Sequence, residues 1–268
     1  MSELKLSDSA SLHYEVHGEQ GPWLVLVSGI GGHGAFWTEQ VRHFSSSYRV
    51  VIHDQRGHGQ STGGGADSGI AQASSDVLKL LDELGADRVF LVGHSMGGLI
   101  VQQFALDHGD RVEGLVIGGS GAAADDYTRL ILGFRQRILE KLGPADFCRL
   151  QTLLTVGAAA HTTPIEHILA MEERSLQSLP ANDVLLARLA SIAAFNRTNE
   201  LGSLKMPTLI VSSEDDVQAI PEAGQQLAEL IPHAQLTVLP AGGGHFFPKT
   251  TPAPYNTLLE QFLHGLAS

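Results

Sequence analysis

The segment RVFLVGHSMGGLI, residues 88–100, decides the fold of this 268-residue chain. Its residues 89–92 form an unbroken apolar run, which is typical of a strand buried on both faces of a parallel sheet. The G-x-S-x-G pattern of Gly93, Ser95 and Gly97 then leads into apolar residues at helical spacing. A serine in so tight a turn adopts a strained backbone, which the flanking glycines make possible. The segment therefore predicts a nucleophile elbow, with the Ser95 hydroxyl at the positive end of a helix.

Strand and helix patterns alternate on both sides of this segment. The strand patterns cover residues 3–6, 12–16, 23–27, 48–54, 89–92, 111–117, 208–213 and 235–239. The helical patterns cover residues 70–84, 99–109, 221–230 and 253–266. This alternation predicts an α/β fold with a mostly parallel eight-stranded sheet, right-handed crossovers and helices on both faces. The first two strands are expected to pair antiparallel at one edge.

Residues 121–205 break the alternation, because they contain helical patterns and no convincing strand. We interpret them as a helical cap, or lid, inserted into a core domain that comprises residues 1–120 and 206–268. One cap helix is expected over residues 127–142, with an apolar side made of Leu130, Ile131, Phe134, Ile138 and Leu142. Its arginines, Arg129, Arg135 and Arg137, are expected elsewhere on the helix. Most cap arginines should be solvated, although one that faced the pocket could pair with a substrate carboxylate.

Composition limits the partners of the protein. A net charge of −12 and a pI near 5.4 argue against nucleic acid and anionic membranes. The single cysteine, Cys148, excludes an intramolecular disulfide and is expected to be a buried apolar residue. The N-terminus lacks the pattern of a signal peptide, and no apolar run is long enough to span a bilayer. We therefore expect a cytoplasmic protein, monomeric or homodimeric, that acts on a small molecule without a cofactor or metal.

A serine hydroxyl needs a base to activate it and a third group to orient that base. Reactive groups in a parallel sheet gather in the loops after the carboxyl ends of the strands. His245 follows the last strand through the flexible sequence AGGGH, so it is the candidate base. The loop after the strand at residues 208–213 supplies three candidate acids, Glu214, Asp215 and Asp216. This gives the chain order serine, acid, histidine that accompanies such an elbow.

The whole layout resembles the α/β-hydrolase superfamily over nearly the full chain. In that superfamily the acid usually comes three residues after a small residue that ends the strand. With Ser213 in that position the resemblance selects Asp216, and Asp215 is the alternative.

The oxyanion of the reaction is expected to bind two backbone N–H groups. Met96, directly after the nucleophile, supplies one of them. The resemblance places the other in the loop after residues 23–27, where the family usually has His-Gly and this chain has Ser28-Gly29. The N–H of Ile30 is therefore the favoured donor, with Gly31 as the alternative. The change at Ser28 removes a side chain that often braces this loop.

Two other kinds of site are poorly supported. His53, Asp54 and His58 could suggest a metal cluster, but HDQRGHGQS resembles the D-x-R-G-x-G-x-S segment of the superfamily, where its role is structural. The glycines of SGIGGHG lack the residues that complete a phosphate-binding or dinucleotide-binding motif.

The elbow and its neighbours indicate the reaction. A serine disfavours haloalkane dehalogenases and epoxide hydrolases, and His94 fits esterases and lactonases better than carbon-carbon bond hydrolases. DVQAIPEAGQQLAELI resembles 3-oxoadipate enol-lactonases, whereas LVSGIGGHGAFW and DDYTRLILGFRQRIL resemble aminoacrylate hydrolases. We expect a serine hydrolase that cleaves a small carboxylic ester or lactone through an acyl-enzyme on Ser95. The alternatives are hydrolysis of a C–N or C–C bond, cofactor-free perhydrolase activity, and a ligand-binding receptor.

Overall fold

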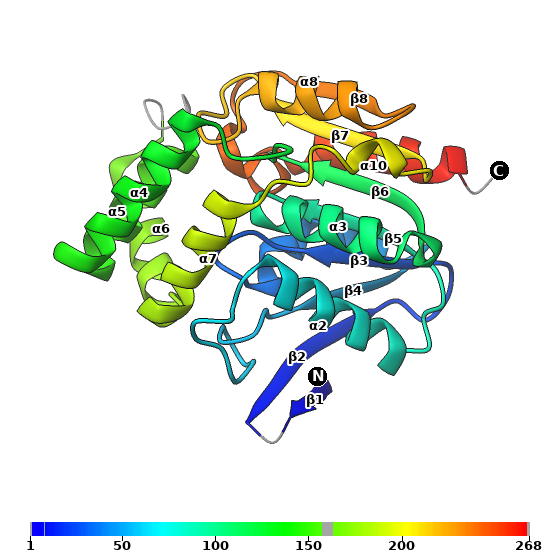
Figure 1. Cartoon of the computed structure of the whole chain (residues 1–268), viewed down its shortest axis with the longest axis horizontal. Coiled ribbons are helices and arrows are strands. Elements are labelled where there is room, and N and C mark those ends of the chain that lie inside the picture. The colour runs from blue at the N-terminus through cyan, green and yellow to red at the C-terminus, as the bar shows by residue number, and fades with distance from the viewer. Residues whose placement is uncertain (1, 8, 157–162, 267–268) are drawn as a thin grey trace.

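The computed structural model describes residues 2–7, 9–156 and 163–266. An eight-stranded sheet forms its centre, in the order β1-β2-β4-β3-β5-β6-β7-β8 (Figure 1). The strands are β1 Ser2–Ser7, β2 Ala10–His17, β3 Trp23–Val27, β4 Arg49–His53, β5 Val89–His94, β6 Val112–Gly118, β7 Thr208–Ser213 and β8 Gln235–Leu239. The pairs β1–β2 and β2–β4 are antiparallel and all others are parallel. The predicted sheet is confirmed.

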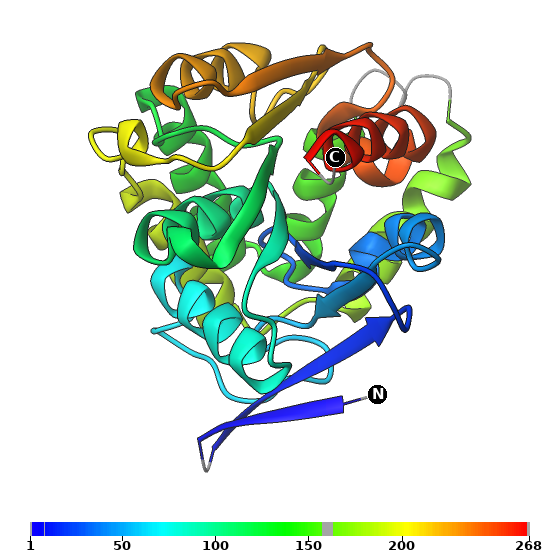
Figure 2. The ribbon, with the colours of Figure 1, turned by 90° about the vertical axis from the view of Figure 1, so that its right-hand side faces the viewer.

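Helices cover both faces of the sheet (Figure 2). Alternate side chains of β3 point to opposite faces: Val25 packs in a core with α2 (Ile70–Glu83), α3 (Met96–Asp107) and α8 (Pro221–Leu230). Leu24 packs in a second core with α1, α9 and α10, which span Thr38–Phe44, Phe247–Thr250 and Pro252–Leu266. No sequence pattern predicted the short helix α1. None of the helices in the described ranges is long and apolar enough to cross a membrane.

Among the described residues, four α-helices lie between β6 and β7 in the chain, on the side of the sheet to which the parallel strands point (Figure 1). They are α4 Asp126–Lys141, α5 Pro144–Val156, α6 Ile165–Gln177 and α7 Asn182–Ala194. Residues 157–162 of this region lie outside the described ranges. Helix α4 falls where the sequence analysis expected a cap helix, over residues 127–142. The cap domain with bounds at residues 121 and 205 stays a prediction.

The buried face of α4 differs from the predicted one. Leu130 is 64% exposed and Phe134 is 48% exposed, whereas Arg135 is only 5% exposed. Of the predicted residues, Ile138 does join the small core shared with α5 and α7, but it does so together with Leu132 and Leu139. Apolar residues occur on two sides of α4, so its sequence alone could not show which side meets its neighbours.

The turn at Ser95 has the strained backbone that the sequence predicted for a nucleophile elbow. Ser95 lies between β5 and α3 with a backbone φ of 58°, a left-handed value that is rare for residues other than glycine. The flanking glycines allow α3 to approach the sheet closely. A Cβ at Gly97 would lie 2.1 Å from the carbonyl oxygen of Val27, and one at Gly93 would lie 2.2 Å from the carbonyl oxygen of Gly97. The G-x-S-x-G pattern is therefore a packing requirement as well as a turn.

We expect Gly97→Ala to lower the free energy of unfolding by about 3 kcal/mol, because its Cβ would collide with backbone that cannot move aside. The matched control is Gly133→Ala on α4, where a Cβ meets no atom within 4 Å. That change should raise the stability by up to ~1 kcal/mol through helix propensity. Urea unfolding of both variants measures the difference, and equal stabilities would contradict the packing argument.

Candidate active site

The three predicted residues Ser95, His245 and Asp216 come together at the carboxyl ends of the strands. His245 Nε2 lies 2.9 Å from Ser95 Oγ, and His245 Nδ1 lies 2.8 Å from Asp216 Oδ2. His245 is 3% exposed and Asp216 is 2% exposed, so water competes little for this hydrogen-bonded chain. In this arrangement Asp216 can hold the imidazole tautomer that leaves Nε2 free to accept the serine proton.

The carboxylate of Asp216 is held in its charged form. Its Oδ1 accepts hydrogen bonds from the backbone N–H groups of Gln218, at 2.8 Å, and Ala219, at 3.0 Å. Burial opposes the charge, but the interaction with His245 and these backbone donors outweigh burial and hold the pKa of Asp216 below its ordinary value. An ionised Asp216 can stabilise a protonated His245.

The other two candidate acids support the loop that carries His245. Asp215 accepts hydrogen bonds from the N–H groups of Gly242, at 2.9 Å, and Gly244, at 3.0 Å. Glu214 accepts one from the N–H of Ala241 at 3.1 Å. Asp215, the alternative candidate, therefore binds the backbone of the histidine loop, whereas Asp216 binds the imidazole.

His94, which the sequence analysis used only to compare families, fixes the backbone of His245. Its Nε2–H donates to the carbonyl oxygen of His245 at 2.7 Å, and its ring stacks on Phe36 with ring centres 5.3 Å apart. Burial lowers the pKa of His94 to about 3, so the ring is neutral at physiological pH. Its place beside Ser95 was the only sequence signal of this role.

One predicted oxyanion donor follows Ser95 directly, and the loop that carries the other approaches the elbow. Met96 is the first residue of α3, so its N–H has no partner within the helix. A Cβ at Gly29 would lie 3.1 Å from Ser95 Cβ, which brings the loop that contains Ile30 against the elbow. Gly32 N–H closes this loop by donating to the carbonyl oxygen of Gly29 at 2.9 Å.

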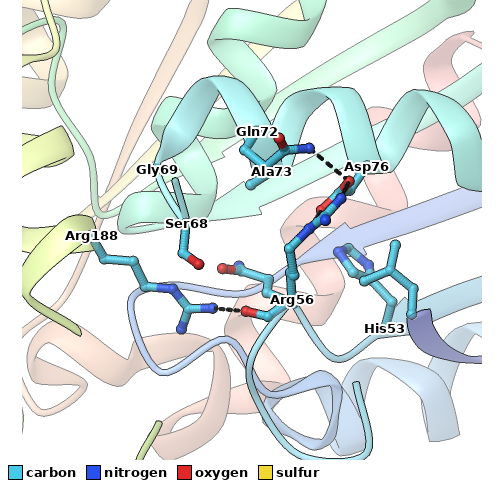
Figure 3. Close-up of a pocket in the computed structure, with 10 residues that line it drawn as sticks. His53, Arg56, Ser68, Gly69, Gln72, Ala73, Asp76 and Arg188 are labelled. Atoms are coloured by element: carbon cyan, nitrogen blue, oxygen red, sulfur yellow. Dashed lines mark hydrogen bonds and ion pairs between the residues drawn. The ribbon is translucent and has the colours of Figure 1, made fainter. Parts of the chain in front are cut away.

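Two buried side chains that the sequence did not single out brace the same loop. Gln55 Nε2 donates to the carbonyl oxygen of Ser28 at 2.7 Å. Arg188 of α7 is 1% exposed, and it donates to the carbonyl oxygens of Ile30 at 2.7 Å and Arg56 at 3.0 Å. Figure 3 shows the side chain of Arg188 extending from α7 to the carbonyl of Arg56. These contacts hold the loop where the family usually has a histidine.

Asp54, one of the residues considered as a metal cluster, is held by other contacts. Asp54 accepts hydrogen bonds from His33 Nδ1–H at 2.8 Å and from the N–H groups of Gly34, at 2.9 Å, and Gln60, at 3.0 Å. Burial opposes the charge of Asp54, but these donors outweigh it and hold the pKa of the carboxyl far below its ordinary value. No group of three or more His, Cys, Asp or Glu side chains that could hold a metal occurs within the described ranges.

A cavity of about 140 Å³ opens beside Ser95 and His245. Its wall is formed by the start of α3, the loop after β6, helix α4 and the loop that carries Asp216. Its polar and charged lining residues are Ser95, Ser120, Asp125, Thr128, Arg135, Gln218, Glu222, Gln226 and His245. The site therefore offers a nucleophile, a base and a cavity beside them.

Comparison with known proteins agrees with this geometry. The profile of the family described as the alpha/beta hydrolase fold matches residues 22–252. The chain belongs to the α/β-hydrolase family. The resemblance stated from the sequence is thereby confirmed, and the protein is an enzyme of the α/β-hydrolase type.

Individual relatives include proteins named as carbamate hydrolases and an enol-lactonase. The chain is 32% identical over 263 residues to a protein of Caulobacter sp. (strain K31) named as a carbamate hydrolase, RutD, which covers 96% of this chain and 97% of the relative. A relative of the same name from Agrobacterium fabrum is 32% identical over 257 residues, 94% of this chain and 98% of the relative. The enol-lactonase of Burkholderia xenovorans LB400 matches with a TM-score of 0.83 at 26% identity, over 95% of this chain and 97% of that one.

We expect the ionised Asp54 to make stability depend on pH. Its lowered pKa contributes stability above the unfolded-state value of about 3.9, and this contribution is lost as the pH falls below that value. The stability difference between wild type and Asp54→Asn should shrink by up to ~1.4 kcal/mol per pH unit below a pH of about 4. Urea unfolding at a series of pH values tests this. Parallel pH profiles for the two proteins would show that Asp54 is not the titrating group.

Proposed function

We propose that the protein hydrolyses a small carboxylic ester or lactone through an acyl-enzyme on Ser95. The observation that carries this proposal is the chain of hydrogen bonds from Asp216 through His245 to Ser95 at the wall of the cavity. A seryl hydroxyl has little nucleophilicity of its own, and this arrangement supplies the base that it lacks.

Acylation begins when Ser95 Oγ attacks the carbonyl carbon and His245 Nε2 takes the serine proton. Asp216 stabilises the imidazolium through Nδ1–H. The carbonyl oxygen becomes an oxyanion, which the N–H groups of Ile30 and Met96 bind. When the bond to the leaving group breaks, His245 returns the proton to the alkoxide, which departs as an alcohol or as the opened end of a lactone.

Deacylation repeats these steps with water. His245 takes a proton from a water molecule, whose oxygen attacks the acyl carbon. The ester bond to Ser95 then breaks, and the imidazolium returns the proton to Ser95 Oγ. The product is a free carboxylic acid, and the enzyme regains its starting protonation state.

Hydrolysis of a C–N bond is the second candidate. The relatives named as carbamate hydrolases are about one third identical over nearly the whole chain, which favours it. The same residues would act, but His245 would then protonate a leaving nitrogen. A matched ester and amide, 4-nitrophenyl butyrate and butyryl-4-nitroanilide, separate the two candidates by their kcat/KM values. Products of a wider panel of lactones and carbamates can be identified by mass.

Labelling with a fluorophosphonate tests the nucleophile directly. We expect wild type to be labelled, Ser95→Ala to be unlabelled, and His245→Ala to react at least about 100-fold more slowly because the base is lost. An intact, folded wild-type protein that is not labelled would refute the proposal.

Asp216→Asn should lower kcat by about 10³- to 10⁴-fold, since the imidazole would lose its orienting carboxylate. Asp215→Asn is the matched control, because it removes a neighbouring charge that binds the histidine loop and Ser213 rather than the imidazole. We expect this control to be less stable than wild type and to keep a kcat within about tenfold of the wild-type value. Full activity of Asp216→Asn together with loss in Asp215→Asn would reverse the assignment of the acid.

A further inference from the structure

Arg135 of α4 is a buried cation at the cavity that contains Ser95 and His245. Its side chain lines that cavity, and the residue is only 5% exposed. Removing a charged group from water costs several kcal/mol unless a partner compensates for the lost hydration. The burial of this guanidinium therefore calls for a compensating interaction, which a solvated arginine would not need.

No carboxylate of the described residues forms an ion pair with Arg135. Its Nη2 donates to the side-chain oxygen of Gln151, and its Nη1 lies 3.5 Å from that of Gln218. Its guanidinium carbon lies 5.5 Å from the centre of the Phe147 ring. Within the described ranges, Nε is buried without a hydrogen-bond partner. Neutral amides and an aromatic ring thus leave its positive charge uncompensated.

Arg188 is likewise buried without a carboxylate partner among the described residues, but it donates to two backbone carbonyl oxygens. Three other arginines between β6 and β7 differ from Arg135 in having an acidic partner. Arg129, Arg149 and Arg197 each form an ion pair with a nearby carboxylate, at 3.1, 2.8 and 2.5 Å respectively. Burial lowers the pKa of Arg135 to about 10, which still leaves it charged at neutral pH. Arg135 is therefore a buried, charged donor without an acidic partner.

The carboxylates that share the cavity wall do not fill this role. Asp125 is exposed and caps α4 by accepting the N–H of Thr128 at 2.6 Å. Glu222 is likewise exposed, at the start of α8. Because the whole chain carries a net charge of −12, its general field repels anions. The buried cation of Arg135 would instead attract an anion inside the cavity.

We propose that Arg135 binds a carboxylate group of the substrate while the acyl carbon lies at Ser95. The substrates would be small molecules that carry both a carboxylate and a hydrolysable acyl bond, such as monoesters of dicarboxylic acids or lactones with an acid side chain. A planar guanidinium with free N–H groups suits a carboxylate, which can accept two hydrogen bonds from it. Arg135, Ser95 and His245 line the same cavity of about 140 Å³, so one small molecule can contact both the guanidinium and the nucleophile.

This inference rests on the proposed hydrolysis at Ser95, so the experiment separates the two. The substrates are mono-4-nitrophenyl esters of glutaric, adipic and pimelic acids, each compared with a neutral 4-nitrophenyl ester of the same chain length. Spontaneous hydrolysis is subtracted. We expect wild type to prefer the charged ester of one chain length, as a ratio of kcat/KM values, by about 10- to 100-fold. Arg135→Met should abolish this preference, chiefly through KM, and Arg135→Lys should keep part of it.

Arg137→Met is the matched control, because Arg137 lies on the same helix and is exposed. It removes the same charge without changing the cavity, so the ratio should stay as in wild type. Thermal unfolding and fluorophosphonate labelling report whether Arg135→Met is folded. Since the preference is a ratio, a general loss of activity in this variant cancels.

Binding without chemistry supplies the second measurement. Ser95→Ala should bind the monomethyl ester of the preferred acid in calorimetry, and the added change Arg135→Met should weaken this binding at least about tenfold. A wild-type enzyme that hydrolyses the neutral esters but shows no preference at any length would overturn the carboxylate site and leave the proposed function intact. A preference that persists in Arg135→Met would overturn it as well. Binding that depends on Arg135, in a protein that neither reacts with fluorophosphonate nor cleaves esters, would support the site and refute the proposed function.

Discussion

The close approach of helix α3 to the sheet is the constraint on which the rest of this structure depends. A side chain at Gly97 would overlap the carbonyl of Val27, and the chain turns from β5 into α3 through Ser95 with a φ of 58°. The N–H of Ser95 donates to the carbonyl of Gly118 at 2.8 Å, which ties the turn to the neighbouring strand β6. The hydroxyl therefore has a fixed position, and the base and the acid must be brought to it by other loops.

The run of three acids after β7 shows how those loops are held. Adjacent carboxylates repel one another, and in a solvated loop they would give no unique conformation. Here Glu214 and Asp215 accept N–H groups of residues 241–244, while Asp216 accepts those of Gln218 and Ala219. His94 then fixes the carbonyl of His245 from the other side. The imidazole is thus oriented by contacts that exist before any substrate binds, which is the kind of preorganisation that favours catalysis.

Local patterns in the sequence were sufficient to predict the sheet and the elbow. Buried strands of the parallel sheet appear as continuous apolar runs, and a glycine-flanked serine between a strand and a helix leaves few alternative conformations. The face of α4 could not be predicted, because Leu130 and Phe134 on one side compete with Leu132 and Leu139 on the other. Arg135 was expected away from the apolar side of its helix. Its burial depends on how α4 packs against α5 and α7, and that packing is set by residues far away in the chain.

The loop after β3 depends on the core and on the helices between β6 and β7 in different ways. The carbonyl of Gly29 accepts the N–H of Gly32, so the peptide that carries the N–H of Ile30 is held within the loop itself. The carbonyl of Ile30 accepts Arg188 of α7, and since the peptide bonds are trans, the N–H of Gly31 points away from this arginine. Displacement of α7 would therefore release the peptide of Gly31 and leave that of Ile30 in place. An oxyanion site built on Ile30 therefore needs no contact from α7. Helix α4 would influence the choice of substrate through Arg135, and it would not influence the breaking of the bond.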